Sequence, residues 1–353
     1  MKTSICKITF LFFVCSMLML PYSKAQYNKC AGQNVIYEDS DLYSKDKSVR
    51  KKARSKAKIK IATTDEVLDY VMPEVAEEEA QILRQSNKSY RLEMQEQSDG
   101  TMKEVRVERK KVAVDKYGNA LSNKYDLAVD GAFAGQTIAV LHFYTGENFN
   151  FEKPKKALAE KGFGVYRWLN YPPSPEELEE KLKMANQLWI ISNSDQRLND
   201  KHLAVIKKFF ESGKGVYIWG DNSPYYADAN YVGAALLDVT MQGNLSGGNS
   251  VQLKEKNNKS GIQQNHLITT GMNYLFEGIT IATIDKNEHM TPLVWGSAGN
   301  LVTAVYEQDG KRAIFDGGFT RLYCNWDTAG TGRYVKNAAA WLANIEHGGL
   351  VKK

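Results

Sequence analysis

Cysteine and histidine are scarce in this sequence, which restricts the chemistry available to it. The 353 residues include 4 cysteines and 5 histidines. No two histidines have the short helical spacing of a zinc site, and no segment has the Lys-Ser/Thr signature of a phosphate-binding P-loop. We therefore expect no metal and no cofactor.

Long hydrophobic runs are also missing, except for one near the start. The run Ile8–Leu20 follows Lys2 and Lys7, and Ser23-Lys24-Ala25 behind it has the small-x-small pattern of a cleavage site. This predicts a signal peptide over residues 1–25, cut before Gln26, in a secreted protein (periplasmic in a Gram-negative host). The run is short for a membrane span, and a retained anchor is the alternative. No membrane span is expected after signal removal.

Signal removal changes the cysteine count. Cys6 and Cys15 leave with the signal, so that Cys30 and Cys324 remain. In an exported protein these two either form one disulfide or stay as two free thiols, and the sequence leaves both possibilities open.

Charge of one sign dominates only one segment. The formal net charge is +5, with 43% hydrophobic and 25% charged residues, which is an ordinary globular balance. Between Lys45 and Lys60 there are nine Lys or Arg residues and one acid, Asp46. We interpret residues 26–60 as a basic, flexible leader that is either simply solvated or contacts an anionic surface. We expect no nucleic-acid partner.

Residues 61–130 predict a small α+β appendage. A capping box at Thr63-x-x-Glu66 precedes an apolar stripe at helical spacing. Alternating residues from Tyr90 to Met94 and from Met102 to Val114 flank the turn Ser98-Asp99-Gly100, which indicates a strand pair. This part contains no catalytic constellation, so packing or partner contact is its expected role.

From residue 131 to 347 the pattern alternates between strands and helices. Such an order predicts an α/β fold, doubly wound, with a mostly parallel sheet. Later strands are expected as antiparallel additions at the sheet edge, and Gly243–Ser250 as a loop. The predicted strands are 138–143, 164–168, 188–191, 216–219, 280–284, 292–295, 301–306 and 312–315, and the predicted helices are 152–161, 174 onward, 199–212, 225–237 and 333–345.

The candidate site follows from this sheet. In open α/β sheets, ligands bind beyond the carboxyl ends of the strands. The turn Gly220-Asp221-Asn222-Ser223 follows the strand 216–219, and Pro224 is expected to open the next helix. The candidate binding residues at these strand ends are Tyr144, Glu147, Ser194, Asp195, Asp221, Asn222, Asp316 and Arg321.

Several interpretations of these residues remain open. Polar turn residues also cap helices and satisfy turn amides without any ligand. Aromatic residues near the strand ends either stack on sugar rings or belong to the core. Alternatively, Asp221 with Glu147 or Asp195 acts as acid and base in a hydrolase. His266 is expected to fix a turn through its ring.

Three motifs carry a resemblance to a known family. They are the strand-turn-helix Gly215–Asp228, the turn Asn265-His266-Leu267-Ile268-Thr269-Thr270-Gly271, and the strand with its glycine turn Ala313–Phe319. With them, Gln136–Ile345 resembles a class I glutamine amidotransferase-like (flavodoxin-like) domain. It is most similar to non-catalytic branches that include gliding-motility and trehalose-utilisation-like domains.

The sequence departs from the active members of that family. They carry a cysteine at the nucleophile elbow and His-x-Glu on a late strand. Here the elbow position has Gly220-Asp221-Asn222, and residues 312–320 contain neither histidine nor glutamate. Without a thiolate no thioester forms. The resemblance thus implies a pseudoenzyme: a non-catalytic binding or scaffold protein whose cleft recognises a carbohydrate or a partner protein.

Overall fold

The structure is a computed structural model that describes residues 90–108, 115–119, 121–264, 266–326 and 329–344. The predicted signal peptide, basic leader and first helix of the appendage lie outside these residues, and so does Asn265. In the described part of the chain, no helix is both long and apolar enough to cross a bilayer.

The predicted strand pair is an antiparallel hairpin. Strand β1 (Tyr90–Glu96) pairs with β2 (Met102–Glu108) in a register that joins Glu96 to Met102. In the turn, the Asp99 carboxylate accepts hydrogen bonds from the backbone N–H and the hydroxyl of Thr101, at 3.0 and 2.6 Å. Its role in packing or partner contact stays a prediction.

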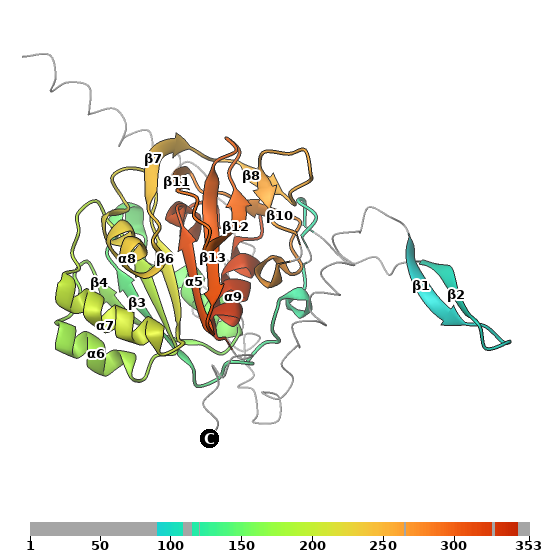
Figure 1. Cartoon of the computed structure of the whole chain (residues 1–353), viewed down its shortest axis with the longest axis horizontal. Coiled ribbons are helices and arrows are strands. Elements are labelled where there is room, and N and C mark those ends of the chain that lie inside the picture. The colour runs from blue at the N-terminus through green and yellow to red at the C-terminus, as the bar shows by residue number, and fades with distance from the viewer. Residues whose placement is uncertain (1–89, 109–114, 120, 265, 327–328, 345–353) are drawn as a thin grey trace, which may run out of the picture. The chain divides into compact units, whose positions relative to one another are not determined.

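The main sheet has eight strands in the order β4-β3-β5-β6-β14-β13-β12-β9. Figure 1 labels β3, β4, β6, β12 and β13 of this sheet. Strands β4, β3, β5, β6 and β14 are parallel, and β13, β12 and β9 are antiparallel to their neighbours. This mixed sheet confirms the predicted α/β fold class. The strands are β3 (Thr137–His142), β4 (Gly164–Leu169), β5 (Gln187–Ile191), β6 (Gly215–Trp219), β9 (Gly261–Ile262), β12 (Met290–Trp295), β13 (Leu301–Gln308) and β14 (Lys311–Asp316).

Helices cover both faces of this sheet. Because successive strand residues point to opposite faces, Ile138 and Val140 join one core cluster, while Ala139 and Leu141 join the other. The first cluster includes residues of α5 (Glu152–Glu160) and α9 (Thr331–Leu342). The second includes residues of α6 (Pro175–Leu182), α7 (Asp200–Glu211) and α8 (Ala227–Leu237). The predicted N-caps Ser174 of α6 and Asn199 of α7 both accept backbone hydrogen bonds.

Three expectations about the second half are wrong. Strand β14 was expected as an antiparallel addition, but it lies inside the sheet. It pairs in parallel with β6 and antiparallel with β13. The expected loop Gly243–Ser250 contains the end of β7 (Met241–Ser246) and the start of β8 (Ser250–Gln252). These strands pair with β11 (Thr280–Ile284) and β10 (Tyr274–Phe276) in two small sheets, so β11 is not a strand of the main sheet. Among the described residues, four 3-10 helices were not predicted: η2 (Asn123–Tyr125), η3 (Gly146–Asn148), η4 (Leu267–Thr269) and η5 (Phe319–Leu322).

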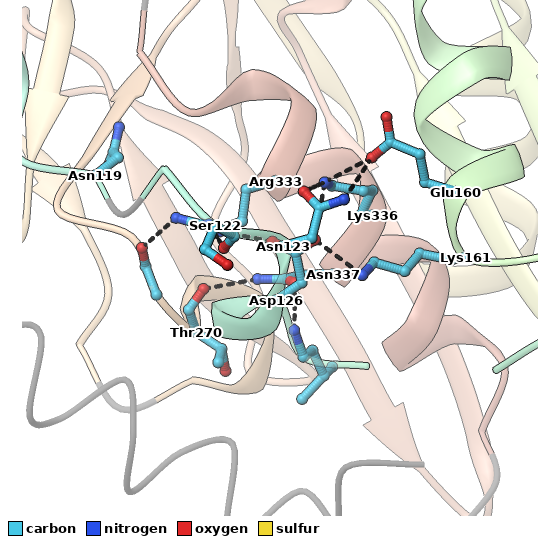
Figure 2. Close-up of polar contacts among 12 residues, drawn as sticks. Asn119, Ser122, Asn123, Asp126, Glu160, Lys161, Thr270, Arg333, Lys336 and Asn337 are labelled. Atoms are coloured by element: carbon cyan, nitrogen blue, oxygen red, sulfur yellow. Dashed lines mark hydrogen bonds and ion pairs between the residues drawn. The ribbon is translucent and has the colours of Figure 1, made fainter. Parts of the chain in front are cut away.

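A buried charge network fastens the segment around η2 to the α/β body (Figure 2). Asp126 is 2% exposed, and its carboxylate lies 2.7 Å from Arg333 Nε, 2.8 Å from Lys336 Nζ and 3.0 Å from Lys161 Nζ. Burial alone would raise the pKa of Asp126, but Lys336, Lys161 and Arg333 together lower it below its usual value. Asn337 adds a neutral link by accepting from the backbone N–H of Leu127 at 2.7 Å.

The network and the core around it include residues that precede the predicted start of the α/β domain at residue 131. Leu127 and Ala128 belong to the same core cluster as α5 and α9, although they precede residue 131. The polar partners of Asp126 come from the end of α5 and from α9. Residues 126–128 are thus built into the α/β body. Whether the preceding appendage forms a separate domain stays a prediction.

Candidate functional site

The candidate site lies where the parallel strands end. The chain runs from β3 to β4 on one side of β3 and then to β5 on its other side. The strand order therefore reverses between β3 and β5, which is where open α/β sheets bind ligands. The segments that leave β3, β5, β6 and β14 at this end carry most of the predicted site residues.

The loop after β3 has an unusual backbone. Glu147, Asn148 and Phe151 have φ angles of 52°, 59° and 64°, in the left-handed region that side chains disfavour. Phe151 is 1% exposed, so core packing holds it there. Each such residue costs on the order of 1 kcal/mol and persists only where its surroundings impose it. Since strain of this kind concentrates at functional sites, the loop is the first place to look for one.

An aromatic cluster surrounds Tyr144 at the start of this loop. The Tyr144 ring centroid lies 4.9 Å from that of Phe319, 5.2 Å from that of Tyr225 and 6.2 Å from that of Tyr323. Phe149 stacks on Tyr323 at 4.5 Å. Tyr144, Tyr225 and Tyr323 are partly exposed, whereas Phe319 and Phe149 are buried. We call these five residues the aromatic cluster.

Glycine at position 146 is part of the same arrangement. A Cβ added to Gly146 would lie 2.8 Å from both Cζ and the hydroxyl oxygen of Tyr144. The loop therefore approaches the Tyr144 phenol as closely as a backbone without a side chain allows. Any larger residue would displace the ring or the loop.

Hydrogen bonds join Glu147 to the cluster. The Tyr323 hydroxyl donates to Glu147 Oε2 at 3.3 Å, and Tyr323 also shares a side-chain hydrogen bond with Tyr144. Burial raises the pKa of the half-buried Glu147 carboxyl, although the bond from Tyr323 opposes this. Burial also raises the pKa values of both phenols, so that Tyr144 and Tyr323 stay protonated. The site thus offers a carboxyl group beside aromatic rings.

Asp221 lies behind this cluster in the interior. It is 1% exposed, and it accepts from the backbone N–H of Asn222 at 2.9 Å and from Thr280 Oγ1 at 3.3 Å. Burial raises its pKa well above the usual value, against the opposing effects of these bonds and of Arg321. The backbone N–H of Asp221 donates to the carbonyl oxygen of Tyr225 at 3.2 Å, so Asp221 adjoins the cluster.

The turn after β6 does not have the shape of a nucleophile elbow. An elbow places its nucleophile in a sharp, strained turn directly between strand and helix. Here residues 220–226 include no positive φ, and α8 begins only at Ala227. The expectation that Pro224 opens this helix is wrong: Tyr226 occupies the N-cap, and Pro224 lies in a turn closed by the bond from Tyr225 N to Asn222 O, 2.8 Å.

Three other predicted residues, Ser194, Asp195 and Asn222, are not members of the cluster. Asp195 is exposed, and Ser194 is half-buried with its backbone N–H bound to the Asn193 side chain at 2.8 Å. Asn222 is buried, and its amide group donates to Asn244 Oδ1 at 2.9 Å. The structure therefore brings Tyr144 and Glu147 together, with Asp221 bonded to Tyr225 of the cluster, whereas Asp195 is an exposed residue of the segment after β5.

Asp316 and Arg321 are interior residues, which corrects the expectation that they face a ligand. Both are fully buried, and their ion pair measures 3.2 Å. The hydroxyls of Tyr217 and Tyr334 donate to Asp316 Oδ2 at 3.2 and 3.0 Å. Burial raises the pKa of Asp316 even so, and Arg321 opposes the shift. The pair neutralises itself inside the protein, where solvent does not reach it.

His266 and His142 make structural contacts. His266 Nδ1 accepts from the backbone N–H of Ile268 at 3.2 Å, which confirms the predicted turn. His142 is buried on β3 between Phe149 and Phe151, and its Nδ1 lies 3.2 Å from Arg167 Nη1. Burial first, and then the Arg167 charge, lower the pKa of His142 to about 4. Among the described residues no group of three or more His, Cys, Asp or Glu is arranged to hold a metal.

Cys324 is a buried half of a disulfide. The three other cysteines of the chain lie outside the described residues, so the structure does not identify its partner. Because its sulfur is already bonded, Cys324 is no free thiolate for catalysis.

Sequence reasoning missed two residues at this end of the sheet. Tyr171 follows β4 and is 71% exposed, and Arg197 follows β5 with its guanidinium carbon 4.9 Å from the Tyr171 ring centroid. Both could have been found by the rule that located the others, because each lies in a segment that follows a predicted parallel strand. Their pairing depends on tertiary structure and has no local signal.

Comparison with known proteins gives a limited result. No protein-family model matches the sequence, and no curated protein matches it. Among solved structures, the chain is similar to a ThuA-like protein from Parabacteroides merdae, with a TM-score of 0.38 and 11% identity over 62% of this chain and 92% of that one. It is also similar to exo-β-1,4-mannosidase Op5Man5 from Opitutaceae bacterium strain TAV5, with a TM-score of 0.34 and 13% identity over 62% of this chain. The chain spans 37% of the mannosidase. The α/β assignment rests on the strand order and pairing given above.

Proposed function

We propose that this protein is an exported, non-catalytic binding protein that recognises a carbohydrate at the aromatic cluster. The observation that carries the proposal is the grouping of Tyr225 and Tyr323 around Tyr144, all three partly exposed, with the Glu147 carboxyl accepting a hydrogen bond from Tyr323. A sugar ring presents C–H faces that pack on aromatic rings and hydroxyls that hydrogen-bond to carboxylates. Both kinds of partner are available in this cluster.

Export is supported by two independent features. The N-terminal pattern of residues 1–25 is that of a signal peptide. Cys324 is disulfide-bonded, and structural disulfides persist mainly in oxidising compartments. The basic segment Lys45–Lys60 remains a proposed contact for an anionic surface.

The lack of catalysis is supported by the residues after β6. The family that the sequence resembles needs a cysteine there, and Asp221 occupies the position instead. Asp221 is 1% exposed, and the bond that Cys324 already makes removes the one described thiol. A degenerate amidotransferase-like domain that keeps a ligand site but no nucleophile fits these observations.

Glycan binding by the purified mature chain tests the proposal. We expect binding on a glycan array, and we expect Tyr144→Ala or Tyr225→Ala to weaken it at least tenfold in calorimetry. Tyr166→Ala is the matched control, because Tyr166 is an aromatic residue on β4, 40% exposed, outside the cluster. Wild-type protein that binds no glycan, or binding that survives both cluster substitutions, contradicts the proposal. If the cluster binds a protein instead of a glycan, the ligand belongs to the other predicted class, a partner protein.

A hydrolase is the second candidate. It is favoured by Glu147, since a carboxyl whose pKa burial raises is suited to act as a general acid. Asp221 is poorly placed as its partner because it is buried and hydrogen-bonded to Asn222 and Thr280. Turnover of aryl glycosides that disappears in both Glu147→Gln and Asp221→Asn would support the hydrolase and contradict the binding proposal.

A further inference from the structure

Tyr171 combines high exposure with a fixed orientation. Its side chain is 71% exposed in the segment that follows β4, the strand next to β3. Exposed tyrosines normally keep their rotamer freedom, and immobilising them on binding costs free energy. Here one side of the ring is already occupied, because the Arg197 guanidinium carbon lies 4.9 Å from the ring centroid.

Arg197 is itself held by the backbone. Its Nη1 donates to the carbonyl oxygen of Phe143 at 3.4 Å and to that of Asn170. Asn170 has a φ of 63°, the left-handed conformation that turns the chain directly before Tyr171. The ring of Tyr171 therefore rests on a guanidinium that two strand ends fix, and most of its surface remains exposed.

A hydrogen bond links this residue's loop to the aromatic cluster. Thr145 Oγ1 donates to Asn170 Oδ1 at 2.5 Å. Thr145 directly follows Tyr144, and Asn170 directly precedes Tyr171. The loops that carry the two tyrosines are thus joined side by side at the same end of the sheet.

We propose that Tyr171, backed by Arg197, forms a second sugar subsite beside the aromatic cluster, so that the ligand is an oligosaccharide of two or more units. This inference rests on the proposed function and names the class of its ligand. One unit binds at Tyr144, and a neighbouring unit stacks on the exposed surface of Tyr171. Pre-orientation of the ring lowers the entropic cost of stacking.

A chain-length series tests the subsite. The probes are cello-, manno- and xylo-oligosaccharides of one to six units, measured by calorimetry with the mature chain. We expect affinity to rise about tenfold or more from the monosaccharide to the longer members. Tyr171→Ala should remove this rise and leave the monosaccharide affinity unchanged, whereas Tyr171→Phe, which keeps the ring, should preserve it. Tyr166→Ala again serves as the control.

The outcomes separate the two proposals. If Tyr171→Ala leaves the chain-length dependence intact, or if monosaccharides bind as tightly as hexamers, the subsite is wrong while carbohydrate binding stands. If the wild-type chain binds no member of any series, both the subsite and the proposed function are contradicted. Circular dichroism of each variant verifies that an affinity loss is not a loss of folding.

Discussion

Replacing Asp126 with asparagine removes the negative charge that three buried cations share. Arg333 Nε, Lys336 Nζ and Lys161 Nζ lie 2.7, 2.8 and 3.0 Å from the Asp126 carboxylate, which is 2% exposed. Removing one partner of a buried ion pair costs about 3–5 kcal/mol because it leaves charge uncompensated. We expect the Asp126→Asn variant to lose stability on this scale.

The contacts that the three cations keep place the expected loss of stability near the lower end of the range of about 3–5 kcal/mol. Lys161 keeps Asp130 at 2.6 Å, and Lys336 keeps Glu160 at 3.0 Å. Arg333 keeps the carbonyl oxygens of Gly271 and Ser122 at 2.9 and 2.8 Å. Each cation therefore retains an acceptor, and we expect a decrease of about 3 kcal/mol in the free energy of unfolding.

Urea unfolding at pH 7, followed by tryptophan fluorescence, measures this difference. The matched control is Asp130→Asn, because the Asp130 side chain is 55% exposed and pairs with the same Lys161. Exposed pairs contribute about 0–1 kcal/mol, so the control should lose little. A loss of less than about 1 kcal/mol in Asp126→Asn, or equal losses in both variants, would refute the reasoning.

The same residue predicts a pH dependence. Because the pKa of Asp126 is lowered in the folded protein, its stabilisation is present above the unfolded pKa of about 3.9. It is lost as the pH falls through the folded pKa. The stability difference between wild type and Asp126→Asn should therefore shrink in acid, and a difference that grows in acid would contradict the sign.

Three further predictions concern other parts of the described chain. Burial raises the pKa of Asp221 in the folded protein. Its contribution to stability is therefore present below about pH 4 and is lost as the pH rises through the folded pKa. Urea unfolding should show that Asp221→Asn gains free energy of unfolding relative to wild type, and that this gain grows with pH. Asn148 has a φ of 59°; Asn148→Gly should leave the melting temperature nearly unchanged, whereas Asn148→Val should cost about 1–2 kcal/mol. Cys324→Ser should lower the free energy of unfolding by about 2–5 kcal/mol. Peptide mapping without reductant should recover Cys324 linked to Cys30, which is the one other cysteine left after signal removal. A free Cys30 thiol would contradict this pairing.

Local patterns were sufficient for much of the α/β body. The buried parallel strands are short continuous apolar runs, as in Leu188–Ile191, and such runs mark strands covered on both faces. The caps Ser174 and Asn199 were readable because an N-cap depends on a few consecutive residues. The position of the site followed from the rule that ligands bind beyond the carboxyl ends of the strands.

Properties set by distant residues were not readable. The direction of β14 depends on its pairing with β6, and no residue within β14 specifies that direction. Strands β7 and β8 were concealed by glycine and asparagine, which normally indicate a loop. Asp316 ends β14, and Glu147 lies in the loop that follows β3. Arg321, Tyr217 and Tyr334 enclose Asp316 in the interior. Only tertiary structure distinguishes the two carboxyl groups.

The place of β14 in the sheet has a consequence for synthesis on the ribosome. Strand β6 pairs with β5 on one side and with β14 on the other. More than 90 residues of chain separate β6 from β14. Until Lys311–Asp316 leaves the exit tunnel, the backbone N–H and C=O groups on that edge of β6 have no neighbouring strand, and β13 has no connection to the parallel half. A nascent chain therefore exposes an aggregation-prone edge from the emergence of β6 until that of β14.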